Sequence, residues 1–190
     1  MQGKNPSRGQ VVVLMRHAEA AAAAEGGSDF ERTLTAQGER EAAAVAGQLA
    51  EAGWAPSFVI CSAAWRTRQT FSIVSRAWGG AIEVEYRDDL YLAEPESIAR
   101  AIWAASGVDQ GVGQAAARGV LVIGHNPGIE LLASQLAAKS LPMPPATAVI
   151  FAYERAQSDS AASDADTGDP ATVYTLRMIS RVVPGEPVGS

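Results

Sequence analysis

Residues 11–20 read VVVLMRHAEA, and this stretch decides how the chain folds. The run from Val11 to Met15 is continuously apolar, which is typical of a strand that is buried on both faces of a parallel sheet. Arg16 and His17 follow directly, so the strand ends on two side chains that carry charge or titrate. In open α/β sheets, ligands bind beyond the carboxyl ends of the strands. The stretch therefore predicts a central strand that delivers Arg16 and His17 to a ligand site.

Apolar strand patterns alternate with alanine-rich helical patterns along the rest of the chain. Thr35 can cap the first helix, and Gly53 can end it. The order predicts an α/β fold, a three-layer α/β/α sandwich with a mainly parallel central sheet, to which the last two strands add an antiparallel edge strand. We expect further strands at 58–61, 81–86, 119–123, 147–153 and 173–179, and helices at 35–53, 63–78, 95–105 and 129–138.

Length and composition predict one soluble domain over residues 1–190, with 47% hydrophobic residues to build its core. The net charge of -6 and the lack of a basic run argue against nucleic acid and membrane surfaces as partners. We expect residues 1–9 to be flexible, and the polar, acidic residues 155–171 to form a flexible loop. The single cysteine and the lack of a leader or spanning segment fit a cytoplasmic protein.

Polar residues of similar character follow three of the predicted strands. The strand at 58–61 runs into Ser62 and then Arg66, and the strand at 119–123 runs through Gly124 into His125. If these strands are parallel to the first, both histidines of the chain and two arginines meet at one edge of the sheet. Two guanidinium groups suit a phosphoryl group, because each can pair bidentately with phosphate oxygens.

Histidines placed between arginines are biased toward the neutral form, since nearby positive charge opposes protonation. A neutral imidazole can attack phosphorus and form a phosphohistidine intermediate, which water then hydrolyses. The other histidine can stabilise charge on the phosphoryl oxygens in the transition state. This scheme needs no metal or other cofactor, and two histidines and one cysteine form no metal-ligand motif.

The chain resembles the histidine phosphatase superfamily, whose fold is phosphoglycerate mutase-like, and within it the SixA-type phosphohistidine phosphatases. The resemblance covers most of residues 11–153, and its segments come in the family's order. These segments are LMRHAEA (14–20), RTLTAQGEREA (32–42), CSAAWRTRQT (61–70), LYLAEPESI (90–98) and VLVIGHNPGIELLA (120–133).

The resemblance implies that His17 is the phosphorylated nucleophile and that Arg16 and Arg66 bind phosphate. His125 corresponds to the late histidine that follows a strand in the family. Many relatives have glycine where this chain has Ala18, and proline in place of Ala63. Because alanine also occurs at the first of these positions in the SixA-like branch, we expect the activity to survive both changes.

Mutase-like relatives carry a glutamate proton donor in the loop after the third strand. No motif in this chain identifies its equivalent. Glu94, at a predicted strand-to-helix junction, is the first candidate, and Asp88 and Asp89 are weaker ones. A SixA-type enzyme can lack this acid, because a phosphohistidine leaving group does not need a dedicated proton donor, whereas an alkoxide does.

Other residues near these motifs have more ordinary interpretations. Arg32 can border the phosphate pocket or pair with Asp29. Arg68 points to a different side of its helix from Arg66, so we expect it at the surface. Cys61 is expected to be a small core residue.

Three functions fit these residues. The first is a metal-independent phosphatase that acts on phosphohistidine of a partner protein, and the second is a small-molecule phosphomonoesterase or a phosphoglycerate mutase-like enzyme. The third is a non-catalytic module that binds phosphorylated partners, although such a module needs the arginines and not His17. The chain has no long insertion before residue 119 to build a lid over a small molecule, which favours the first function.

Overall fold

The computed structural model describes residues 11–79, 81–106, 119–155 and 174–186. The predicted flexible segments at 1–9 and 155–171 lie outside these ranges, apart from residue 155, which ends a strand. A mixed sheet of six strands forms the middle layer. The strands are β1 (Val11–Arg16), β2 (Phe58–Ser62), β3 (Glu83–Arg87), β4 (Val120–Gly124), β5 (Ala148–Arg155) and β6 (Tyr174–Val182).

The strand order is β3-β2-β4-β1-β5-β6. The first four of these strands pair in parallel. β5 is antiparallel to β1, and the edge strand β6 is antiparallel to β5. The predicted α/β class, with a mainly parallel sheet and an antiparallel edge strand, is therefore confirmed.

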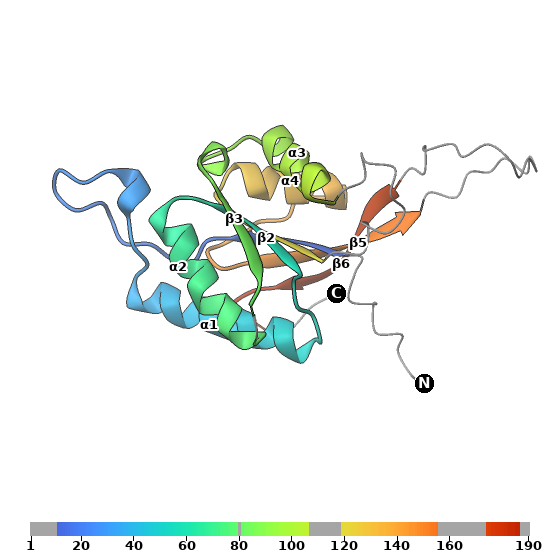
Figure 1. Ribbon diagram of the computed structural model, residues 1–190, viewed down its shortest axis with the longest axis horizontal. Helices are drawn as coiled ribbons and strands as arrows, with labels where there is room; N and C mark the ends of the chain where they lie inside the picture. The colour runs from blue at the N-terminus through green and yellow to red at the C-terminus, as the bar shows by residue number, and fades with distance from the viewer. Residues whose placement is uncertain (1–10, 80, 107–118, 156–173, 187–190) are drawn as a thin grey trace, which may run out of the picture.

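Helices cover both faces of the sheet (Figure 1). α1 (Ala36–Glu51) and α2 (Trp65–Val74) pack on one face, and α3 (Pro95–Ser106) and α4 (Gly128–Ala137) pack on the other. Short 3-10 turns are present at η1 (Asp29–Glu31), η2 (Ser75–Ala77) and η3 (Asp88–Leu90). None of the helices in the described ranges has both the length and the apolar character that crossing a membrane requires.

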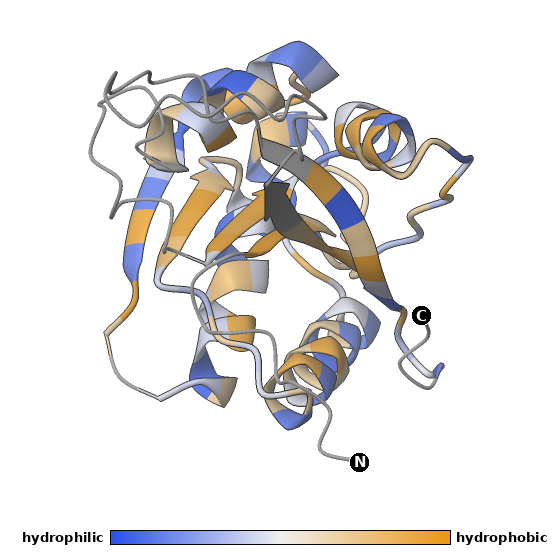
Figure 2. Ribbon diagram, turned by 90° about the vertical axis from the view of Figure 1, so that its right-hand side faces the viewer, coloured by the Kyte–Doolittle hydropathy of each residue, from blue (hydrophilic) through white to orange (hydrophobic). Residues whose placement is uncertain are grey.

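The continuous apolar run of β1 is explained by these two covered faces. Val11, Val13 and Met15 belong to the core under α1 and α2, whereas Val12 and Leu14 belong to the core under α3 and α4. Successive side chains of a strand point to opposite faces, so a strand between two cores has to be apolar at every position. Figure 2 shows hydrophobic residues concentrated in the strands at the centre of the molecule.

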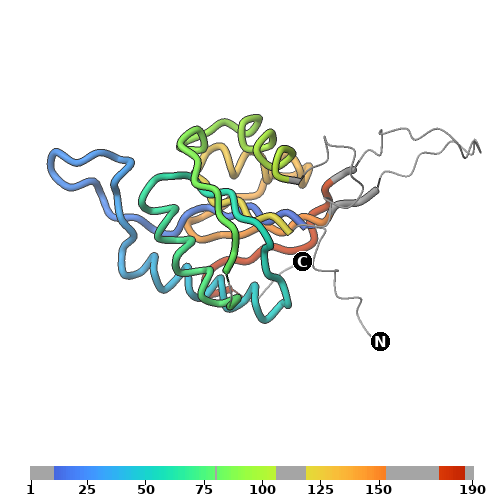
Figure 3. The backbone as a smooth tube through the Cα atoms, viewed as in Figure 1, coloured from blue at the N-terminus to red at the C-terminus, as the bar shows by residue number. Residues whose placement is uncertain are grey.

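The sheet register brings the ends of distant strands together. Arg16 at the end of β1 lies opposite Gly124 at the end of β4, and Cys61 of β2 lies opposite Ile123. In Figure 3, β1 runs beside β4 and β5 although more than a hundred residues separate them in sequence. The residues that follow β1, β2 and β4 consequently share one edge of the sheet.

Candidate active site

A pocket of about 440 Å³ lies at this edge of the sheet. Its lining includes all four residues that the sequence singles out, Arg16, His17, Arg66 and His125. The loops after β1 and β3 and the segments around α4 supply the rest. These further lining residues are Glu19, Ala20, Asp29, Arg32, Tyr91, Leu92, Asn126 and Pro145.

His17 is held at the base of the pocket with one ring nitrogen free of its proton. Its backbone N–H donates to the Gly124 carbonyl at 3.0 Å, which continues the β1–β4 pairing. Its Nδ1 lies 2.7 Å from the Ala18 carbonyl oxygen, which can only accept, so Nδ1 carries the hydrogen. In the neutral ring, Nε2 therefore has a lone pair, and the Arg66 Nε–H donates to it at 3.3 Å.

Burial keeps the His17 ring neutral. The residue is only 9% exposed, and this desolvation is the main reason that its pKa falls to about 4. The hydrogen bond to Ala18 opposes the fall, while the positive charges of Arg66 and Arg16 add to it. At neutral pH the ring is uncharged and lies beside guanidinium groups, as a nucleophilic imidazole would need to be.

His125 lies next to His17, with 5.1 Å between the two ring centroids. Its Nε2 is 2.8 Å from the Ser62 hydroxyl, so a residue at the end of β2 orients this ring. Burial, followed by the proximity of His17 and Arg66, lowers the pKa of His125 to about 3. Its Nδ1 is buried and has no hydrogen-bond partner among the described residues, which leaves one ring nitrogen available to a ligand.

Arg66, in the first turn of α2, is 2% exposed and is anchored by Asp29 of η1. Its Nη1 donates to the Asp29 carbonyl at 2.6 Å, and its Nη2 donates to the Asp29 carboxylate at 3.0 Å. The same carboxylate accepts a hydrogen bond from the Tyr91 hydroxyl at 2.5 Å and one from Arg32 at 2.8 Å. These contacts, that of Tyr91 first, hold the pKa of Asp29 far below its usual range. Asp29 is therefore ionised at neutral pH and is a poor proton donor.

Arg16 is oriented by the segment between α4 and β5. Its Nη1 donates to the Met143 carbonyl at 2.8 Å, while its Nε is buried without a partner among the described residues. Glu130 fixes this segment, because its carboxylate accepts from the Met143 N–H at 2.9 Å and from the Asn126 amide at 2.8 Å. Arg16 thus keeps donor capacity for a bound anion.

None of the predicted proton donors lines the pocket. Glu94 is exposed, and its backbone carbonyl accepts from the N–H groups of Ser97 and Ile98 in α3. Asp88 is exposed, and Asp89 pairs with Arg87 at 2.6 Å. Among the described lining residues, the carboxylates are instead those of Glu19 and Asp29. Glu19 accepts a hydrogen bond from the Thr35 hydroxyl at 2.7 Å.

The structure also tests the expectations for Arg32, Arg68 and Cys61. Arg32 both lines the pocket and pairs with Asp29, so both of the roles considered for it are observed. Arg68 is exposed and lies over the Tyr86 ring at 4.3 Å, as a surface residue. Cys61 is buried, and burial raises the pKa of its thiol to about 12, which makes it an unreactive core residue.

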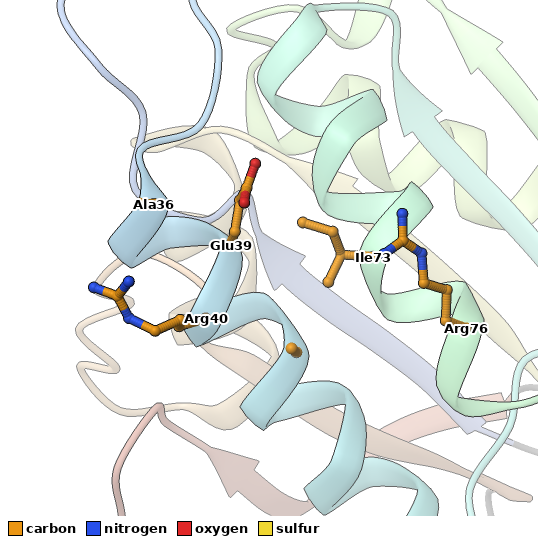
Figure 4. A pocket seen from close by; sticks show the side chains of 6 residues that line it. Ala36, Glu39, Arg40, Ile73 and Arg76 are labelled. Atoms are coloured by element: carbon orange, nitrogen blue, oxygen red, sulfur yellow. The ribbon is translucent and has the colours of Figure 1, made fainter.

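A second cavity, of about 400 Å³, lies between α1 and α2 (Figure 4). In Figure 4, Ile73 points from α2 toward α1, and Glu39 stands on the facing helix. Its lining residues are Ala36, Glu39, Arg40, Ala43, Ile73 and Arg76, which include no histidine, cysteine or other nucleophile. The histidine pocket is therefore the candidate active site.

Acidification is expected to destabilise the fold between pH 6.5 and about pH 4. Both histidines have a folded-state pKa far below the ordinary value of 6.5. The unfolded chain consequently binds more protons in this range, and the stabilisation present above pH 6.5 is lost as the pH falls. The loss at pH 5 amounts to about 2 kcal/mol for each histidine.

Melting temperatures at pH 7.5 and pH 5, in buffers free of phosphate, measure this effect. The His125→Gln variant is the control, because it should lose less stability than the wild type over the same interval. Asp29 does not interfere, since its stabilising contribution is lost only below its ordinary pKa of 3.8. An equal fall in melting temperature from pH 7.5 to pH 5 for the two proteins would contradict a buried, neutral His125.

The fold and the pocket define a class of protein: an α/β scaffold in which two neutral histidines and two arginines line one pocket. The family description that matches the sequence, over residues 12–91, is the histidine phosphatase superfamily (branch 1). A search of curated proteins gave no match.

Solved structures support the same class. A candidate phosphohistidine phosphatase SixA from Agrobacterium tumefaciens is 27% identical, with a TM-score of 0.70 over 93% of this chain and 99% of that one. The protein histidine phosphatase SixA in complex with tungstate is 21% identical, with a TM-score of 0.69 over 92% of this chain and 97% of that one. A candidate SixA from Nakamurella multipartitia is 24% identical, with a TM-score of 0.65 over 95% and 99% of the two chains. Over residues 12–91 the chain matches the histidine phosphatase superfamily, and this match together with the similarity to the Agrobacterium tumefaciens structure indicates a phosphatase.

Proposed function

We propose that this phosphatase removes the phosphoryl group from phosphohistidine on a partner protein and that it does so without a metal ion. His17 is the nucleophile in this proposal, and Arg16, Arg66 and His125 bind the phosphoryl group. The observation that carries it is the geometry of His17: Nδ1 donates to the Ala18 carbonyl, and Nε2 carries no hydrogen and accepts from the Arg66 Nε–H at 3.3 Å.

In the first step, the His17 Nε2 lone pair attacks phosphorus as the bond from phosphorus to the substrate nitrogen breaks. Arg16 and Arg66 balance the charge of the phosphoryl oxygens with their remaining N–H groups. His125 contacts an equatorial oxygen through the ring nitrogen that Ser62 leaves free. The products are a phosphorylated His17 and a substrate imidazole.

In the second step, water attacks phosphorus and the bond to His17 Nε2 breaks, which releases inorganic phosphate and restores the neutral ring. The hydrogen on Nδ1 stays with the Ala18 carbonyl throughout, so the same tautomer is ready for the next turnover. The positive charge that Nε2 phosphorylation places on the ring makes it a good leaving group.

The acid–base character of the pocket favours phosphohistidine as the substrate. In the part of the chain that the structure describes, two carboxylates line the pocket: Asp29 is held in its ionised form by Tyr91, Arg32 and Arg66, and Glu19 accepts a hydrogen bond from the Thr35 hydroxyl. None of Glu94, Asp88 and Asp89 lines it. An alkoxide leaving group needs a proton donor that contributes about 10² to 10⁴ to the rate. A phosphohistidine whose other ring nitrogen is protonated leaves as neutral imidazole and does not need this donor.

Substrate preference tests the proposal. We expect kcat/KM for a protein that carries phosphohistidine to exceed kcat/KM for sugar phosphates by at least about 100-fold. This factor is the smallest rate contribution that a general acid usually makes, and sugar phosphates would lack it here. p-Nitrophenyl phosphate, whose leaving group also needs no acid, should fall between the two. Sugar phosphates that are hydrolysed as fast as the phosphohistidine protein would instead identify a general small-molecule phosphomonoesterase.

A further inference from the structure

We propose that Leu92 is a specificity-determining residue, whose side chain forms an apolar contact with the imidazole ring of the leaving group. This inference rests on the proposed function and adds to it a site for the part of the substrate beyond phosphorus. It starts from a half-exposed leucine in the pocket lining whose backbone conformation is unusual for a residue with a side chain.

Leu92 follows Tyr91 in the loop between η3 and α3, and it lines the histidine pocket. Its φ angle is +50°, in the left-handed region that disfavours a side chain with a Cβ. The side chain is 49% exposed and belongs to neither of the two hydrophobic cores. An apolar residue here therefore has an unfavourable backbone conformation without the compensation of burial.

The fold explains this backbone conformation but not the leucine. The next residue, Ala93, is packed so closely against the start of α4 that a Cβ at Gly128 would overlap the Ala93 carbonyl. The chain must turn sharply to make this approach directly after Tyr91, whose ring meets that of His125 at 5.4 Å. Glycine or asparagine would make the same turn with less strain. The packing of the loop therefore does not explain why residue 92 is a leucine.

The in-line geometry of phosphoryl transfer offers an explanation for this leucine. Phosphoryl transfer needs the attacking and leaving atoms roughly in line, so the leaving group extends from phosphorus away from His17. His17 is almost buried at the base, while Leu92 is half exposed. The leaving group therefore passes the exposed part of the pocket lining on its way to solvent.

The pocket lining offers both apolar and charged side chains to the leaving group. Tyr91 and Leu92 are adjacent and offer carbon atoms, whereas Glu19 and Arg32 offer charges. An imidazole ring has two apolar faces that can pack on a leucine side chain, whereas a sugar would lose water from its hydroxyl groups there. The contact consequently selects the leaving group of phosphohistidine.

Two leucines of similar exposure allow a matched experiment. Leu92→Asn keeps a residue that tolerates positive φ and removes the apolar contact. Leu131→Asn is the control, because Leu131 is 46% exposed on α4 and does not line the pocket. Each variant is assayed on a phosphohistidine peptide and on phosphoramidate, whose leaving group is ammonia and has no ring.

For Leu92→Asn, we expect kcat/KM for the peptide to fall about tenfold more than kcat/KM for phosphoramidate, as for a lost apolar contact. Leu131→Asn should leave this ratio unchanged, and the melting temperature of Leu92→Asn should not fall below that of the wild type. A Leu92→Met variant, which keeps an apolar chain, should restore most of the preference.

Two outcomes would overturn the proposal. An equal loss on both substrates would give Leu92 a structural role, and an unchanged ratio would make its exposure incidental. Failure of the proposed function is a separate result, because it shows in the wild type. A wild-type enzyme that hydrolyses phosphoramidate but not the phosphohistidine peptide would exclude both proposals.

Discussion

Replacement of His17 by glutamine is expected to lower kcat by at least about 10⁴-fold, the scale on which enzymes lose activity when their nucleophile is removed. Glutamine has a similar polar end but no lone-pair nitrogen that can bond to phosphorus. The loss should be the same for a phosphohistidine protein and for p-nitrophenyl phosphate, because both reactions pass through the same phosphoenzyme. Initial rates at saturating substrate measure it.

His125→Gln is the informative comparison, because the two histidines lie side by side. His125 contacts the phosphoryl group without bonding to phosphorus in our proposal. Its loss should cost about 10² to 10³ in kcat, as for a single donor to a developing oxyanion. If the His17→Gln enzyme retained more activity than the His125→Gln enzyme, His17 would not be the nucleophile.

Arg66→Lys is expected to lower kcat/KM by about 10² to 10³, even though the positive charge is kept. A lysine has one nitrogen, and it cannot contact His17, the two Asp29 oxygens and a phosphoryl oxygen together. In the structure the guanidinium of Arg66 reaches His17 through Nε and Asp29 through both terminal nitrogens. The substitution should therefore misplace the charge as well as remove donors.

Arg68→Lys is the matched control for this prediction, because the same substitution is made two residues further along the same helix. Arg68 is exposed and does not line the pocket, so its replacement should change kcat/KM by less than about twofold. Melting temperatures of the two variants separate loss of function from loss of fold. Similar activities for the two variants would show that Arg66 does not bind the phosphoryl group.

The central part of this architecture was predictable because it follows from local patterns. The uninterrupted apolar run of β1 indicates burial on both faces, and Val12 and Val13 do lie in opposite cores. Polar residues directly after parallel strands must meet at one edge of the sheet, which is why the sequence alone groups Arg16, Arg66 and His125.

The contacts of Asp29 with distant residues were not predictable from such patterns. Asp29 and Arg66 are 37 positions apart, and no periodicity indicates that η1 folds back to anchor this arginine. The same is true of the hydrogen bond from Tyr91 to Asp29, which holds the carboxylate ionised. The position of Glu94 between a strand and a helix suggests a place near the site, but such a position does not determine which way a side chain points.

The most direct measurement of the central claim is the location of the covalent phosphate. The chain has two histidines, so the question has two answers that a peptide map can separate. The enzyme is mixed with substrate for milliseconds, quenched in alkali to preserve phosphohistidine, digested and examined by mass spectrometry. Phosphate on the peptide that contains His17 is the result that our account predicts. Phosphate on the His125 peptide, or no phosphoenzyme under conditions of rapid turnover, would contradict it.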